Sequence, residues 1–107
     1  MGDSRIFSVE TRVVERDIFV FRCHDPRRGN RWMFVVKTSA LREVQPNDPF
    51  DPVAAFGSLR AAIYGAACRR MRFADPMSPQ ELSSEDLWVG LDLESSRPRL
   101  AATGPHA

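Results

Sequence analysis

The run Cys23-His24-Asp25 sets a thiol, an imidazole and a carboxylate next to one another, the groups of a cysteine nucleophile, its base and an orienting acid. The base must lie within hydrogen-bond reach of the sulfur. Neighbouring residues on a strand point to opposite faces, so Cys23 and His24 diverge if this segment is extended. We therefore expect a buried cysteine followed by the first residues of a turn, and we assign no catalytic residue. An enzyme that uses Cys23 and His24 stays open as a third hypothesis.

Metal ions need more ligands than this segment supplies. A structural zinc site takes four Cys or His ligands. The chain has two cysteines and two histidines, and His106 lies in a C-terminal segment without hydrophobic period. Cys23 and Cys68 are too far apart for a zinc knuckle, and we expect both to be reduced thiols. The sequence predicts no metal site and no cofactor.

Two groups of arginines form the other candidate site. They are Arg27, Arg28 and Arg31 at a predicted hairpin tip, and Arg69, Arg70 and Arg72 at the end of a predicted helix. Arginines beside an aromatic ring such as that of Trp32 can hold phosphates and stack a base. However, 15 basic residues against 14 acidic ones leave a net charge of +1, which is not the electrostatic footprint of a nucleic-acid-binding domain. Nucleic-acid binding is therefore the second hypothesis.

Composition sets the frame for these side chains. The 107 residues suffice for one domain with a modest core, and 43% hydrophobic with 27% charged residues is typical of soluble domains. This excludes a disordered chain, a collagen-like fibre and a disulfide scaffold. No apolar run of about 18 residues occurs, and the opening Met1-Gly2-Asp3-Ser4-Arg5 is not a signal peptide. We expect a cytoplasmic protein that does not contact membranes.

Three extended segments form the predicted sheet. Residues 5–14 alternate with a period of two, and the side chains expected on one face are Phe7, Val9, Thr11 and Val13. Residues 18–23 are apolar on both faces, which is typical of a central strand. Phe19 and Phe21 lie on one of these faces, and Ile18 and Val20 on the other. Residues 31–37 form the third strand, and short connections predict an antiparallel meander.

Residues 51–72 form the strongest predicted helix. Asp51 has the chemistry of an N-cap, and Pro52 suits the first helical position. One apolar stripe is expected, made of Val53, Phe56, Leu59, Ile63, Ala67 and Met71. Gly57 and Gly65 lie off this stripe, where they would permit a second helix to approach closely.

The segment after this helix is predicted to hold a short helix and a further strand. Ser78-Pro79-Gln80-Glu81 has the pattern of a capping box. Alternation over residues 87–94 then predicts a fourth strand at an edge of the sheet, with Trp88 facing outward. The alternative is the reversed register, in which Trp88 packs on the helix. Residues 95–107 lack any period and are expected to be disordered.

Several short motifs resemble a known family. They are Ser4-Arg5-Ile6-Phe7 with Arg12, Phe21 with His24-Asp25, Phe34 with Val36, Ala40-Leu41 with Pro46, Ala55-Phe56, Arg60, Ile63, Ala66-Ala67 and Asp86-Leu87. Over residues 5–87 the chain is similar to the small bacterial domain-of-unknown-function family numbered 1488. The resemblance implies a small α+β fold and no established activity, so it assigns no functional residue.

We therefore predict a single α+β domain over residues 1–94, an antiparallel sheet of three or four strands with one main helix packed on one face. The other face of the sheet is left uncovered, and Ile18 with Val20 makes it partly apolar. Association with a second copy or another protein would cover it. The sequence predicts a non-enzymatic interaction or regulatory domain. The expected contact residues are Arg27, Arg28, Arg31, Trp32 and Trp88.

Overall fold

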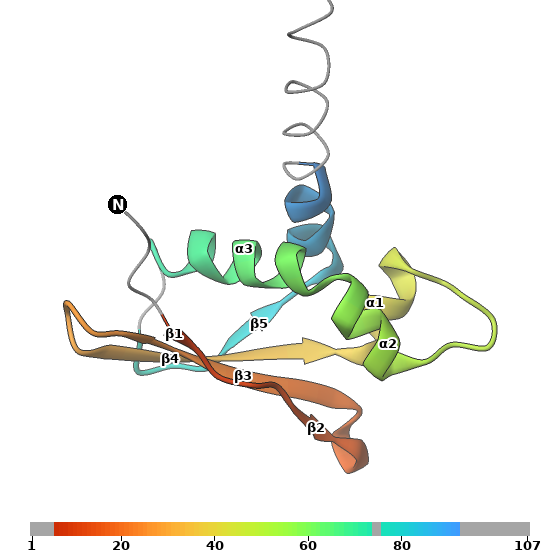
Figure 1. Cartoon of the computed structure of the whole chain (residues 1–107), viewed down its shortest axis with the longest axis horizontal. Helices are drawn as coiled ribbons and strands as arrows, with labels where there is room; N and C mark the ends of the chain where they lie inside the picture. Colours follow the sequence, from red (N-terminus) through yellow and green to blue (C-terminus); the bar gives the residue numbers. More distant parts are fainter. Residues whose placement is uncertain (1–5, 74–75, 93–107) are drawn as a thin grey trace, which may run out of the picture.

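The computed structural model describes residues 6–73 and 76–92 and has an α+β fold, a mixed five-stranded sheet with helices on one side (Figure 1). The strands are β1 (Ile6–Phe7), β2 (Thr11–Val13), β3 (Ile18–Asp25), β4 (Asn30–Lys37) and β5 (Gln80–Leu82). The helices are the single 3-10 turn η1 (Val14–Arg16), then α1 (Thr38–Val44), α2 (Pro52–Ser58), α3 (Arg60–Arg70) and a last helix over residues 84–92. The predicted disorder of residues 95–107 falls outside the described residues.

The long hairpin of β3 and β4 is the centre of the sheet. Its strands pair in antiparallel register from Ile18 opposite Lys37 to Asp25 opposite Asn30. Alternation turns Phe19 and Phe21 toward the helices, where both are buried, and leaves Ile18 and Val20 half-buried on the other face. The predicted central strand and its two faces are confirmed.

The first predicted strand is broken by a one-residue bulge. Phe7 lies opposite Cys23, but Arg12 lies opposite Phe19, so the chain gains one residue between β1 and β2 relative to β3. Ser8 bridges the break, because its hydroxyl accepts a hydrogen bond from the backbone N–H of Arg22 at 2.8 Å. Because of the extra residue, side chains of β2 that would continue the face of Phe7 point to the opposite face of the sheet. The prediction that Phe7, Val9, Thr11 and Val13 share one face is therefore wrong.

An ion pair ties this broken strand to the helices. Nη1 and Nη2 of Arg60, the first residue of α3, donate to the two carboxylate oxygens of Glu10 at 2.5 and 2.9 Å. The hydrogen bonds from Arg60 hold the pKa of Glu10 below its ordinary value, although burial acts in the opposite direction. The bulge segment is thereby fixed against the start of α3.

The fourth strand is not the one predicted. β5 pairs in parallel with β4, with Phe34 opposite Gln80 and Val36 opposite Leu82. The sheet is therefore mixed rather than antiparallel, since a crossover through α1, α2 and α3 returns the chain in the same direction. The capping box expected at Ser78 is also wrong, because β5 occupies Gln80–Leu82.

The predicted main helix is two helices that meet at Leu59. The Asp51 carboxylate caps α2 by accepting from the backbone N–H groups of Val53 and Ala54, as expected. Gly57 and Ser58 are weak helix formers, and the Ser58 hydroxyl donates back to the carbonyl of Ala54. Both features favour a break in the helix at Leu59. The apolar stripe continues across this break with helical spacing, so the sequence pattern did not reveal it.

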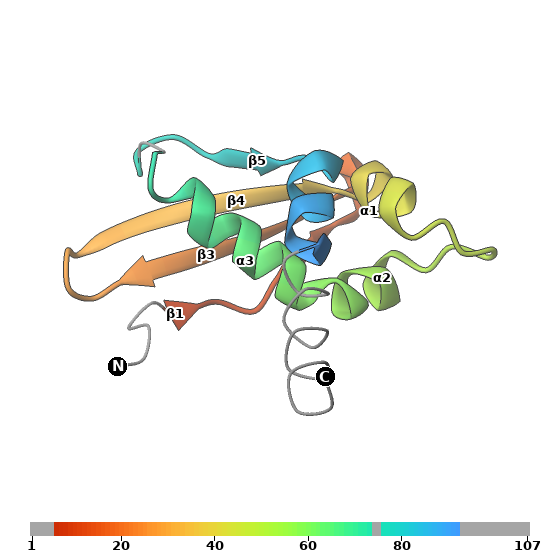
Figure 2. The same cartoon turned by 90° about the horizontal axis from the view of Figure 1, so that it is seen from above.

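Residues 84–92 are helical, so the strand predicted at 87–94 is wrong. Leu87 and Gly90 are buried and Leu91 is half-buried, a three- and four-residue spacing that also satisfied the alternating pattern. Ser83 and Asp86 form the capping box, in which the Asp86 carboxylate accepts from the Ser83 N–H at 2.8 Å and the Ser83 hydroxyl accepts from the Asp86 N–H at 3.3 Å. Seen from above, this helix lies beside α3 on the same side of the sheet (Figure 2).

The Asp86 carboxylate also accepts a hydrogen bond from Nη2 of Arg70, at 2.7 Å, and forms an ion pair with this guanidinium. Burial raises the pKa of Asp86, but the hydrogen bonds from Ser83 and the Arg70 guanidinium outweigh it and lower that pKa below its ordinary value. The carboxylate therefore contributes stability that is fully present above its unfolded-state pKa. That contribution is lost as the pH falls through the lower pKa of the folded state.

We expect Asp86→Asn to lower the free energy of unfolding at pH 7 by up to about 1 kcal/mol. The difference from the wild type shrinks as the pH falls through the folded-state pKa of Asp86, which lies below its ordinary value, because the wild-type carboxylate then also becomes protonated. Urea denaturation across this pH range measures it. Glu85→Gln, at the exposed neighbouring position, is the control and should keep the wild-type acid dependence. Equal loss of stability in acid by Asp86→Asn and the wild type would contradict the assignment.

Candidate functional site: the uncovered face of the sheet

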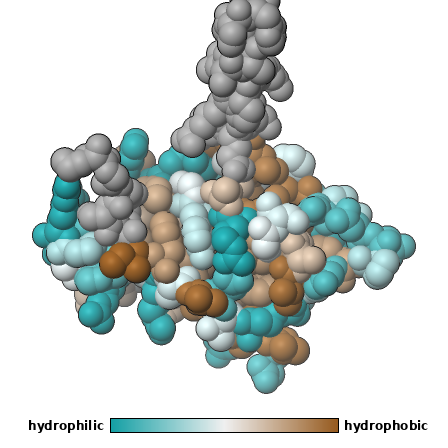
Figure 3. Space-filling model, in the orientation of Figure 1, coloured by the Kyte–Doolittle hydropathy of each residue, from teal (hydrophilic) through white to brown (hydrophobic). Residues whose placement is uncertain are grey.

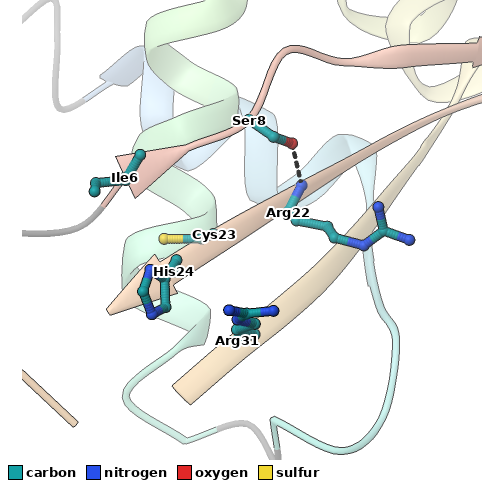
Figure 4. Close-up of a pocket in the computed structure, with 6 residues that line it drawn as sticks. All are labelled: Ile6, Ser8, Arg22, Cys23, His24 and Arg31. Atoms are coloured by element: carbon teal, nitrogen blue, oxygen red, sulfur yellow. Dashed lines mark hydrogen bonds between the residues drawn. The ribbon is translucent and has the colours of Figure 1, made fainter. Parts of the chain in front are cut away.

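Cys23 and His24 lie on opposite faces of β3. Cys23 is fully buried, at 0% exposure, whereas His24 is half-buried on the face away from the helices. Figure 4 shows the sulfur and the imidazole leaving the strand in different directions. The Asp25 carboxylate accepts a hydrogen bond from the backbone N–H of Arg27 at 3.1 Å and so stabilises the turn. The prediction that His24 and Asp25 start the turn is wrong, because both residues pair with β4 at the end of β3. The predicted divergence of thiol and imidazole is confirmed.

The predicted arginine cluster of the hairpin is divided. Arg27 and Arg28 are exposed at the tip, where Gly29 has the positive φ of 72° that the turn requires. Arg31 lies on β4, opposite His24, and is exposed on the face of the sheet that the helices leave bare. Arg27 and Arg28 therefore lie at the tip of the hairpin, whereas Arg31 lies on the face of the sheet opposite the helices.

Trp32 is not a surface residue. It is 4% exposed, lies opposite Cys23 and faces the helices with Phe34 and Val36. Alternation along β4 turns the ring into the core, so Trp32 offers no exposed face on which a base could stack, and its predicted contact with a partner stays a prediction. Its indole Nε1 is buried and has no hydrogen-bond partner among the described residues.

The arginines at the end of α3 are largely engaged within the fold. Arg69 donates to the carbonyl of Asp86 at 3.2 Å, and Arg70 pairs with the Asp86 carboxylate. Arg72 is exposed. The second half of the proposed nucleic-acid surface thus holds the 84–92 helix in place, and one of its three cations faces solvent.

The face of the sheet opposite the helices, which we call the outer face, is not covered by any helix of the described residues (Figure 1). Its side chains on the two central strands are Ile18, Val20, Arg22 and His24 of β3, and Arg31, Met33, Val35 and Lys37 of β4. In Figure 1 the helices α1, α2, α3 and 84–92 all lie on the other side of the sheet. The four aliphatic side chains of this set are half-buried.

Charge on the outer face is uneven. Lys37, at one end, pairs with Glu81 of β5 at 3.6 Å. Arg22 and Arg31 lie at the other end, as diagonal neighbours across β3 and β4, beside His24. Within residues 6–73 and 76–92 no carboxylate forms an ion pair with Arg22 or Arg31. The outer face is an aliphatic strip with a cationic end.

Sequence reasoning found Ile18 and Val20 on this face but missed Arg22, Met33 and Val35. The signal was the alternation of residues 31–37, which already separates Met33 and Val35 from Trp32 and Phe34. Arg22 gives no signal in the sequence, because it stands apart from the other arginines there and meets Arg31 only across the hairpin.

Trp88 lies on the 84–92 helix rather than on an edge strand. It is 49% exposed, as is its neighbour Val89. On the side of the molecule shown in Figure 3, apolar residues form small groups separated by polar ones. Trp88 stays a candidate contact, but it does not belong to the outer face.

The described residues do not indicate a metal site or a membrane-spanning helix. No cluster of three or more His, Cys, Asp or Glu side chains suited to a metal ion occurs among residues 6–73 and 76–92. None of the helices in this part of the chain is long and apolar enough to cross a bilayer. Comparison with protein families, curated proteins and solved structures found no match. The resemblance to family 1488 stays a prediction.

Proposed function

We propose that the chain is a non-enzymatic protein-interaction domain that binds through the outer face of its sheet. The observation that carries the proposal is the row of Ile18, Val20, Met33 and Val35, which no described helix covers. Aliphatic side chains on an open sheet face gain about 25 cal/mol for each Å² removed from water. A partner that packs against this face obtains that gain.

The size of the outer face suits a modest interface. Strands of eight residues such as β3 and β4 are about 26 Å long, and together with the β1–β2 edge they are about 14 Å wide, whereas β5 adds only three residues, or about 10 Å of length. One face therefore offers about 400 Å², and two partners together bury about 800 Å², in the range of small, transient interfaces. This favours a reversible contact over an obligate one.

Protein is favoured over nucleic acid as the partner. Within the described chain the rings of Phe19, Phe21, Trp32 and Phe34 face the helices, so the central strands offer no stacking platform for bases. Arg69 and Arg70 are held by Asp86. The nucleic-acid alternative relies on Arg27, Arg28, Arg31 and Arg72 alone, and it predicts an affinity that falls steeply with salt.

Site-specific photo-crosslinking in the native cells tests the proposal. A photoreactive amino acid replaces Val20 on the outer face, and in a second strain it replaces Val53, which is 60% exposed on α2. We expect a discrete protein adduct from position 20 and none of the same mass from position 53, with the partner identified by mass spectrometry. An adduct of twice the chain mass would mean self-association. Adducts from position 53 but none from position 20 would overturn the proposal.

A further inference from the structure

Two hollows flank Arg22 and Arg31 on the outer face. The first, of about 240 Å³, is lined by Ile6, Ser8, Arg22, Cys23, His24 and Arg31. Figure 4 shows Arg22 and Arg31 bordering it, with Ser8 held to the backbone of Arg22. The second, of about 270 Å³, lies between β4 and residues 76–79 and shares the same two arginines. Arg22 and Arg31 are the two charged residues that line both hollows.

The two arginines bring hydrogen-bond donors to hollows whose lining is otherwise mainly apolar. Each guanidinium offers five N–H groups and no acceptor. Trp32 lines the second hollow, and its buried indole N–H lacks an acceptor. The described carboxylates form their ion pairs elsewhere, at Arg12, Lys37, Arg60 and Arg70. A ligand that fits this lining brings acceptors and negative charge, and a carboxylate matches the planar fork of arginine.

We propose that Arg22 and Arg31 form a carboxylate-binding site, and that the outer face docks a segment of another protein that has acidic residues at one end and aliphatic residues at the other. This inference rests on the proposed function and names its partner class. The aliphatic end lies on Ile18, Val20, Met33 and Val35, and the acidic end enters the hollows.

A second copy of the chain is a poor occupant of this face. A two-fold dimer brings the same face together from both sides. Arg22 and Arg31 then meet either their own copies or the opposite end of the face, where Lys37 already neutralises Glu81. Beyond that end, Asp17 pairs with Arg12, so that Glu15, next to Arg16 in sequence, is the carboxylate of η1 that forms no ion pair within the described residues. The first arrangement opposes like charges, and the second offers the two arginines at most this one carboxylate beside a cation of its own.

The test uses two fluorescein-labelled peptides of twelve residues and the full chain. One peptide has three glutamates followed by alternating valine and threonine, and the other replaces each glutamate with glutamine. Fluorescence anisotropy is expected to show at least about tenfold tighter binding of the glutamate peptide, since hydrogen bonds to charged groups are stronger than neutral ones. The double variant R22Q/R31Q should remove this preference. In a Trp88→Phe background, the emission of Trp32 should change on binding of the glutamate peptide.

A matched control separates a site from general attraction. The variant R16Q/R72Q removes the same charge from exposed arginines on η1 and after α3, and it should keep the preference. Equal binding of both peptides, no binding of either, an equal loss in both double variants, or tighter binding of a single-stranded oligonucleotide would each overturn the inference. The proposed function stands if position 20 still crosslinks to a partner in cells, so the two failures can be told apart.

Discussion

Phe21→Ala is expected to lower the free energy of unfolding by about 3–5 kcal/mol. Phe21 is 1% exposed, and its ring joins the sheet to the helices. The ring centroids of Phe34 and Tyr64 lie 5.3 and 5.2 Å away, and those of Phe7 and Phe56 lie 6.0 and 6.2 Å away. These neighbours come from two strands and two helices, so they cannot all move into the space left by the ring. Urea denaturation followed by far-ultraviolet circular dichroism measures the loss.

Val20→Thr is the matched control for this change. Val20 precedes Phe21 on β3 but lies half-buried on the outer face. Threonine keeps the β-branched shape, and its hydroxyl can reach water, so the cost should stay below about 1 kcal/mol. A cost for Val20→Thr as large as that for Phe21→Ala would mean that the two faces of β3 are assigned the wrong way round.

The contrast between these two residues also shows which parts of the fold could be predicted from sequence. Alternation along residues 18–23 and 31–37 identified the hairpin, its buried face and its partly apolar outer face, because a strand has only two faces to choose between, although β3 continues to Asp25. Asp51 and Pro52 likewise identified the start of α2, since an N-cap depends on local chemistry alone.

Apart from the helix break at Leu59, which Gly57 and Ser58 favour locally, the main wrong predictions concern interactions between distant segments. The bulge between β1 and β2 is visible only in the register of both strands against β3. The parallel pairing of β5 depends on a crossover of more than forty residues, which no local pattern records. Residues 87–94 satisfied the period of a strand as well as that of a helix, and the packing of Leu87 and Gly90 on α3 decided between them. The Arg22–Arg31 pair belongs to the same class, because it exists only across the hairpin.

Gly90→Ala is expected to lower the free energy of unfolding by about 1–3 kcal/mol, even though alanine is the better helix former. A Cβ atom on Gly90 would lie 2.8 Å from the backbone oxygen of Ala62 and 3.1 Å from its Cα atom. Both are backbone atoms of α3, so they cannot rotate away as a flexible side chain could. The 84–92 helix must move off α3, and thermal denaturation should show a lower midpoint.

Gly57→Ala should act in the opposite direction and makes the comparison decisive. A Cβ atom on Gly57 meets nothing within 4 Å, so alanine brings its helix propensity to α2 without a clash and should stabilise the protein by about 0.5–1 kcal/mol. The sequence had assigned a close helix approach to Gly57 and Gly65, whereas the structure assigns it to Gly90. If both substitutions stabilise the chain, the 84–92 helix does not pack on α3 at this distance. If both destabilise it, Gly57 faces a surface that is covered in solution.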